Sequence, residues 1–265
     1  MDTTHEKNLP VMSEHKKGKV ACIVASCAAI GLYFVPYGWY VLYPFMLIYT
    51  FVHEMGHGVA AEIVGGDFVN FKMWLDGSGV ASSMLPHSRL GNAFVAFGGL
   101  IAPAIWAMIF LMLGRSKKLS RIGLYLCAAI CVASLILVVR NIFGVVFVSL
   151  CGLVSFGIAY MCRPRGKEET GKVSMLRDSA VPQYTMLFLA MTLCTCVFTR
   201  GDYLFTDVAQ TAQGPAPSDV GQIAENLFLP YWFWGGLIAA ISLAVLAFGM
   251  WAFFKPEKPK AVKGA

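Results

Sequence analysis

The chain alternates between long apolar blocks and short polar connections. Most blocks approach the roughly 20 apolar residues that an α-helix needs to cross a bilayer. An outer-membrane barrel would instead show shorter segments of alternating polarity. The pattern therefore predicts an all-α polytopic membrane protein with about six to seven transmembrane helices. The apolar blocks cover residues 20–35, 39–64, 90–113, 122–139, 142–162, 184–199 and 230–254.

The segment 67–84 has a different period. Phe71, Met73 and Leu75 alternate with more polar or interfacial positions, which is typical of a strand, and Asp76-Gly77 is a strong turn signal. We therefore expect a small β-hairpin directly after the helix over 39–64. A plain connecting loop is the alternative, because the second strand has weak β propensity.

The polar segments at the two ends divide the chain into three parts. Residues 1–19 form a basic cytoplasmic arm, residues 20–254 a single membrane-embedded domain, and residues 255–265 a basic tail. Within the domain, the loop 201–229 contains aspartate and glutamate but no lysine or arginine. The arm and the basic run at 115–121 are both expected in the cytoplasm, but three apolar blocks separate them, and three crossings would place them on opposite sides of the membrane. We expect either a re-entrant block or a hairpin that dips into the membrane.

Composition narrows the class of protein. Hydrophobic residues make up 57% of the chain and charged residues 14%, against about 25% charged in soluble domains. The formal charge of +6 does not indicate a nucleic-acid partner, since the basic residues lie in short runs beside apolar blocks, as in cytoplasmic flanks of transmembrane helices. The expected environment is a lipid bilayer. The eight cysteines contain no CxxC pair, which argues against a thiolate zinc site.

The most informative motif is His53-Glu54-Met55-Gly56-His57, inside an apolar block. Residues four apart lie on the same face of a helix, so two imidazoles at this spacing can bind one zinc ion. The adjacent Glu54 is then placed to act as general base on a water molecule. A buried polar cluster that only ties helices together is the alternative, although packing does not require this spacing.

The motif and several later segments resemble the site-2 protease family of membrane-embedded zinc metalloproteases, in particular its compact bacterial branch. The resemblance covers roughly residues 45–245, and only the zinc motif is highly specific. The segments that carry it are Phe51 to Gly58, Gly65-Gly66, Asp76 to Val80, Ala96 to Pro103, Val139 to Gly144 and Ser218 to Val220.

The resemblance implies that His53 and His57 bind Zn²⁺, that Glu54 is the general base and that a later aspartate is the third ligand. Asp219, just before the last apolar block, is the preferred candidate, and Asp76 in Leu75-Asp76-Gly77 is the alternative. Asp-Gly is also the preferred pair of a hairpin turn, which weighs against Asp76. Asn141 is a candidate contact to the substrate carbonyl or its oxyanion, or else a polar contact between helices.

The expected activity is hydrolysis of peptide bonds in membrane-protein or peptide substrates. The substrate must be unwound at the cleaved bond, and the strand at 69–75 is a candidate to hold it by β-augmentation. A non-catalytic membrane scaffold or a metal-ion transporter that retains a zinc site is the alternative. The intact Glu54 argues against this alternative, because metal storage needs no general base.

Overall fold

The structure is a computed structural model that describes residues 34–164, 179–199, 201–211 and 214–255, together with Val20, Val24, Cys27, Gly31 and Leu32. Five of its helices are long and apolar enough to cross a membrane, and α2 is of similar length at 26 residues. The predicted fold class is thus confirmed. The long helices are α2 (Gly38–Ile63), α3 (Arg89–Leu113), α4 (Lys117–Leu137), α5 (Ile142–Met161), α7 (Val181–Thr199) and α9 (Tyr231–Phe254).

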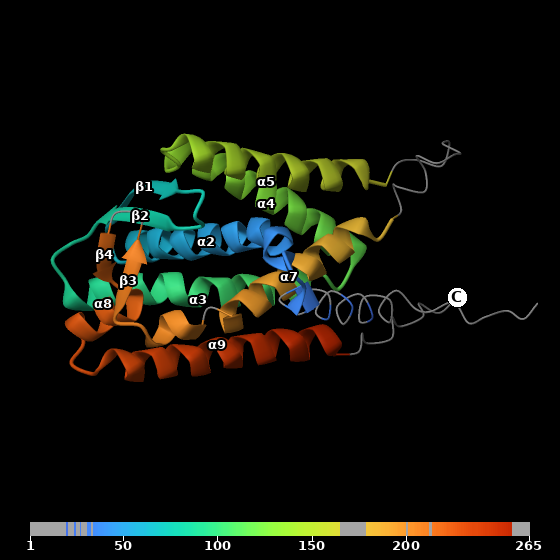
Figure 1. Cartoon of the computed structure of the whole chain (residues 1–265). Helices are drawn as coiled ribbons and strands as arrows, with labels where there is room; N and C mark the ends of the chain where they lie inside the picture. Colours follow the sequence, from blue (N-terminus) through green and yellow to red (C-terminus); the bar gives the residue numbers. More distant parts are fainter. Residues whose placement is uncertain are drawn as a thin grey trace, which may run out of the picture.

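The long helices lie side by side in one bundle, and the short elements gather at one end of it (Figure 1). We call this end, which carries both hairpins and α8 (Asp219–Asn226), the hairpin end. The chain enters it at the end of α2 and leaves it along α3, so these two helices are antiparallel neighbours (Figure 1). The apolar block 20–35 lies largely outside the described residues, as do the arm 1–19 and most of the tail 255–265.

Close packing of α2 against α3 depends on small residues. A side-chain carbon at position 56 would lie 2.5 Å from the Cβ of Ala102 and 2.5 Å from the carbonyl oxygen of Gly98, which leaves room only for glycine. The sequence Gly98-xxx-Ala102 predicts such an approach. Pro44 lies in the first turns of α2, and the helix continues through it. The helix that carries the motif is therefore held at short distance from its neighbour.

The predicted hairpin is present as β1 (Asp67–Met73) and β2 (Gly79–Met84), paired antiparallel. The far edge of β1 is also occupied, because Phe71 N donates to Val138 O at 2.7 Å and Arg140 N donates to Phe71 O at 3.0 Å. In the described chain β1 is therefore interior and β2 is the outer strand of this sheet. This corrects the expectation that the strand at 69–75 offers a free edge to a substrate.

The acidic segment 201–229 is more ordered than a loop. It contains a short 3-10 helix (Gly201–Phe205), a second hairpin of β3 (Val208–Thr211) and β4 (Gly214–Pro217), and α8. Ser218 begins α8 as a typical N-cap, since its Oγ accepts from Gly221 N at 3.0 Å. Buried residues of α8, among them Val220 and Ile223, pack against α3 and α9. These contacts bring the first residue of α8 to the side of α2.

Candidate metal centre

Three side chains from two distant parts of the chain meet at the hairpin end. His53 and His57 come from consecutive turns of α2, and Asp219 is the first residue of α8. The Nε2 atoms of the two histidines lie 3.1 Å apart. Asp219 Oδ2 lies 3.0 Å from His53 Nε2, and Asp219 Oδ1 lies 3.4 Å from His57 Nε2. All three residues are at least half-buried, and His53 and Asp219 are buried.

These separations fit one metal ion. Ligand atoms that each lie about 2.0–2.1 Å from zinc in a tetrahedron are about 3.3 Å from one another. The three observed separations of 3.0, 3.1 and 3.4 Å lie around this value. Two imidazole nitrogens and one carboxylate also form a typical donor set for a catalytic zinc, which leaves one coordination position for water or substrate. The residues present therefore fit the cofactor expected from the motif.

The main chain of α3 sets the orientation of His57. Its Nδ1 lies 2.8 Å from the carbonyl oxygen of Val95, so Nδ1 carries the proton and donates, and Nε2 offers its lone pair to the cluster. A side-chain carbon at Gly99 would lie 2.2 Å from Cε1 and Nε2 of the same ring. The glycine thus provides the space into which the His57 ring fits.

We expect Gly99→Ala to weaken zinc binding by about 10- to 100-fold, the cost typical of disturbing a residue that supports a metal ligand. The added methyl group would displace the His57 ring from the other two ligands. Zinc content and competition with a chelator measure the effect. Gly236→Ala on α9 is the matched control, because a side chain there meets no atom within 4 Å. Equal zinc affinity in the two variants would contradict this role for Gly99.

Glu54 joins the motif to the hairpin. Its Oε2 accepts a hydrogen bond of 2.7 Å from Ala81 N in β2, and the side chain is buried. The preceding turn of α2 contacts the same hairpin, because Thr50 Oγ1 donates to Gly77 O at 2.8 Å. The carboxylate therefore lies between the motif helix and the outer strand of the sheet.

The position of Asp219 results from capping and burial. Ser218 N donates to Asp207 O at 2.9 Å, and Ser218 Oγ also donates to Thr206 O, so the start of α8 is tied to the preceding hairpin region. Burial raises the pKa of the Asp219 carboxyl, but attraction and hydrogen bonds from the imidazoles of His57 and His53, where these rings carry the proton, lower it by more. The net effect holds this pKa below its usual range.

The two other candidate residues, Asp76 and Asn141, make hydrogen bonds that stabilise the first hairpin. Asp76 is exposed in the turn between β1 and β2, where its Oδ1 accepts from Ser78 N at 2.9 Å and from Ser78 Oγ at 2.6 Å. It is not part of the three-residue cluster. Asn141 precedes the first residue of α5, and its side-chain amide pairs with the main chain of Met73 instead of capping the helix, with Oδ1 accepting at 3.2 Å and Nδ2 donating at 2.5 Å. Both polar groups of this side chain are thus engaged in fixing β1.

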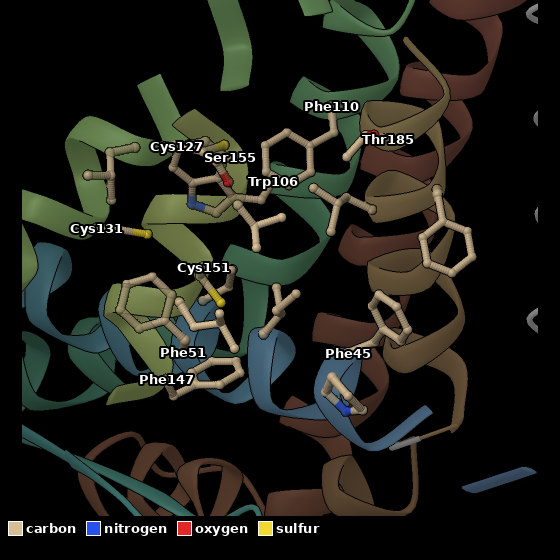
Figure 2. A pocket seen from close by; sticks show the side chains of 18 of the residues that line it. Phe45, Phe51, Trp106, Phe110, Cys127, Cys131, Phe147, Cys151, Ser155 and Thr185 are labelled. Atoms are coloured by element: carbon tan, nitrogen blue, oxygen red, sulfur yellow. The ribbon is translucent and has the colours of Figure 1, made fainter. Parts of the chain in front are cut away.

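An apolar cavity of about 350 Å³ lies on another face of α2 (Figure 2). Ile48, Phe51 and Met55 contribute to its wall, and at about 100° per residue they project away from His53 and His57. Its lining contains three cysteines, Cys127, Cys131 and Cys151, but no histidine or carboxylate. The cavity is therefore separate from the candidate metal centre.

Three groups that contact the site residues could not be predicted from the sequence. These are the Val95 carbonyl that orients His57, the Ala81 amide that holds Glu54, and Tyr203, whose ring lies 6.2 Å from that of His53 between centroids. Two of them are main-chain groups, which every residue has, and so no residue type indicates them. Tyr203 comes from the acidic segment, where the pattern showed neither helix nor strand.

Comparison with known protein families gave a match. The family model described as Peptidase M50B-like matches residues 23–249, which is most of the chain. Neither the comparison with curated proteins nor the comparison with solved structures gave a match. The matched range contains the motif, both hairpins and Asp219. The chain therefore belongs to the M50B-like branch of the site-2 protease family.

Proposed function

We propose that this protein is an intramembrane zinc metalloprotease that hydrolyses peptide bonds of membrane-protein substrates. One observation carries the proposal, namely the convergence of His53, His57 and Asp219 at ligand spacing with Glu54 beside them. Family membership supports peptidase activity, and the apolar helices support an integral membrane location. We assign the protein to the bacterial inner membrane.

His53, His57 and Asp219 would hold the zinc ion. When bound, zinc lowers the pKa of water and polarises a carbonyl group, which is the chemistry that peptide hydrolysis needs. The hydrogen bond from His57 to Val95 supports this assignment, because it presents the unprotonated Nε2 to the cluster.

Glu54 serves as the general base and then as the general acid. Its carboxylate takes a proton from the attacking water and later delivers that proton to the leaving amine. The Ala81 amide holds Oε2, which leaves Oε1 free for the proton transfer. Because the carboxylate is buried between α2 and β2, little competing solvent surrounds it.

The outer edge of β2 is the proposed binding surface for the unwound substrate. Phe71 directs its own N–H and C=O toward 138–140, so its partner Ala81 directs its groups away from β1. The Ala81 amide reaches Glu54 on that side. An extended peptide that pairs with this edge would pass directly beside the general base.

Substrate peptides methylated on single backbone nitrogens test this binding mode. We expect cleavage to fall by about 2- to 10-fold at alternate positions, because each methyl group removes one hydrogen bond worth roughly 0.5–1.5 kcal/mol. Positions between them should tolerate the methyl group, since successive residues of a strand point their N–H groups to opposite sides. A uniform loss along the peptide, or no loss at any position, would exclude pairing with β2.

Removal of the metal tests the activity itself. We expect purified protein in detergent or vesicles to cleave a model transmembrane substrate, to lose this activity with a membrane-permeable zinc chelator, and to regain it when zinc is restored. Heat-treated protein with added zinc is the control for metal-catalysed background. Cleavage that persists in protein shown to be free of metal would overturn the proposal.

A scaffold or metal transporter is the competing proposal, and the arrangement of Glu54 counts against it. Neither role requires a carboxylate held at hydrogen-bond distance from a terminal strand. A metal transporter also needs ionisable groups along a path through its spans. In the part of the chain that the structure describes, the one clustered group of potential ligands is His53, His57 and Asp219.

A further inference from the structure

We propose that the metal centre lies on the non-cytoplasmic side of the membrane, so that this protein cleaves its substrates in the outer half of the bilayer. The statement about cleavage rests on the proposed function, whereas the orientation of the protein in the membrane does not depend on activity. It follows from which charges the fold gathers at each end of the bundle.

Hydrogen bonds show that the ends opposite the hairpin end belong together. Arg115, after α3, donates to the Lys255 carbonyl at the end of α9 at 3.0 Å. Arg121 at the start of α4 donates to the Cys162 carbonyl at the end of α5 at 3.2 Å, and Gln183 at the start of α7 donates to the Gly114 carbonyl at 2.8 Å. These contacts join five helix ends into one surface, which we call the basic end.

The charges of the basic end are all of one sign among the described residues. It carries six lysine and arginine residues and no aspartate or glutamate, and the six are Arg115, Lys117, Lys118, Arg121, Arg163 and Lys255. The sequence that connects α5 to α7 and the sequence after α9 contain further lysines and arginines, from Arg165 to Arg177 and from Lys258 to Lys263. They outnumber the acidic residues of the same two segments, which are Glu168, Glu169, Asp178 and Glu257.

The hairpin end has the opposite character. The segment 201–229 at this end contains no lysine or arginine. Among the described residues, three basic residues lie elsewhere at this end, Lys72, Arg89 and Arg140, and Arg140 donates to the last carbonyls of α4. In the sequence, Arg200 also follows directly after α7. Acidic residues here include Glu62, Asp67, Asp76, Asp207, Asp219 and Glu225.

Cytoplasmic flanks of transmembrane helices are enriched in lysine and arginine, and short loops obey this rule best. The rule places the basic end in the cytoplasm and the hairpin end outside it. The reverse orientation would expose the longest basic runs outside and keep the segment that lacks them inside. Only α2 and α3 cross the bundle between Gly38 and the basic run at 115–121, so the start of α2 and this run lie at the same end of the bundle.

The depth of the site follows from its place in α2. His57 lies 63 − 57 = 6 residues before the last residue of α2, which is about 9 Å from the hairpin end at 1.5 Å per residue. It lies 57 − 38 = 19 residues after the first residue, about 28 Å from the other end. The metal centre is therefore close to the outer surface, and a peptide bond must lie in the outer half of the bilayer to reach it.

Labelling of introduced cysteines tests the orientation directly. Phe228 at the hairpin end is 97% exposed, and Lys118 at the basic end is exposed, and neither belongs to the proposed site. We expect a membrane-impermeant maleimide to label Phe228→Cys in intact spheroplasts and Lys118→Cys only after the membrane is permeabilised. The protein without an introduced cysteine is the control, because it shows how much label the native cysteines take up. The reverse pattern, or labelling of both variants in intact spheroplasts, would overturn the proposal.

A pair of model substrates tests the consequence. Both carry the same transmembrane helix with one helix-breaking segment, placed in the outer half in one and in the inner half in the other. We expect the outer placement to be cleaved at least about a hundredfold faster, since even small misplacement at a catalytic site is costly. Preferred cleavage of the inner placement would overturn the inference. If labelling confirms the orientation and neither substrate is cleaved while other peptide substrates also resist, the proposed function fails and the orientation stands.

Discussion

Replacement of Glu54 by glutamine is expected to reduce peptide hydrolysis by at least about a hundredfold, the usual contribution of a general base. The glutamine amide has nearly the same shape, and its oxygen can still accept the hydrogen bond from Ala81 N. It cannot take a proton from water, however. Zinc content should remain unchanged, because His53, His57 and Asp219 are intact. Initial rates with a model substrate and metal analysis of the same preparation measure both properties.

Glu62→Gln is the matched control for this variant. Glu62 lies on the same helix and also accepts a backbone hydrogen bond, from Phe68 N at 2.8 Å, but it lies outside the metal cluster. The control should keep both zinc and activity, because the amide oxygen can preserve that bond. A Glu54→Gln protein that hydrolyses substrate as fast as Glu62→Gln would remove the basis for a protease and favour the scaffold or transporter.

Replacement of Asp219 by alanine is expected to lower zinc affinity by more than about a hundredfold, since loss of a mere supporting partner already costs 10- to 100-fold. Two imidazoles would remain, and α8 would no longer contribute a donor to the cluster. Activity should fall in parallel with zinc content. Asp219→Asn is a second variant that keeps the size of the side chain and removes its charge, which separates loss of ligation from disturbance of α8.

Asp76→Ala is the control that separates the two aspartates suggested by sequence. Its carboxylate accepts from Ser78 in the hairpin turn and lies outside the three-residue cluster, so the variant should keep zinc and retain most activity. Hydrogen bonds from Ser78 lower the pKa of Asp76, so the turn contact is present at neutral pH and weakens as the pH falls toward that pKa. Loss of zinc in Asp76→Ala together with normal zinc in Asp219→Ala would reverse the ligand assignment.

The helical part of the fold was predictable because its signals are local. Apolar blocks of sufficient length predict spanning helices without any tertiary information, and α3, α5 and α9 begin and end within one or two residues of the predicted blocks. The hairpin β1–β2 was predictable for the same reason, from alternation and an Asp-Gly turn. The second hairpin was not, because Val208–Thr211 and Gly214–Pro217 are too short to show a period.

The edge available for pairing could not be predicted from alternation. Alternation identifies a strand but not its neighbours, and the neighbour of β1 is a segment near residue 139, far along the chain. Its pairing with Phe71 and the amide of Asn141 occupies β1 and leaves β2 as the terminal strand. The same contact explains why Asn141 has no free polar group for a substrate in this structure.

Local sequence was enough to identify the motif and its chemistry, since two histidines four residues apart on a helix share a face whatever surrounds them. The length of the apolar blocks was likewise enough to identify the membrane-spanning class. Which aspartate approaches the histidines depended on tertiary packing, because Asp76 and Asp219 both follow the motif and differ in where packing places them. Burial of Val220 and Ile223 against neighbouring helices, rather than any property of the carboxylate, brings Asp219 to within 3.4 Å of both imidazoles.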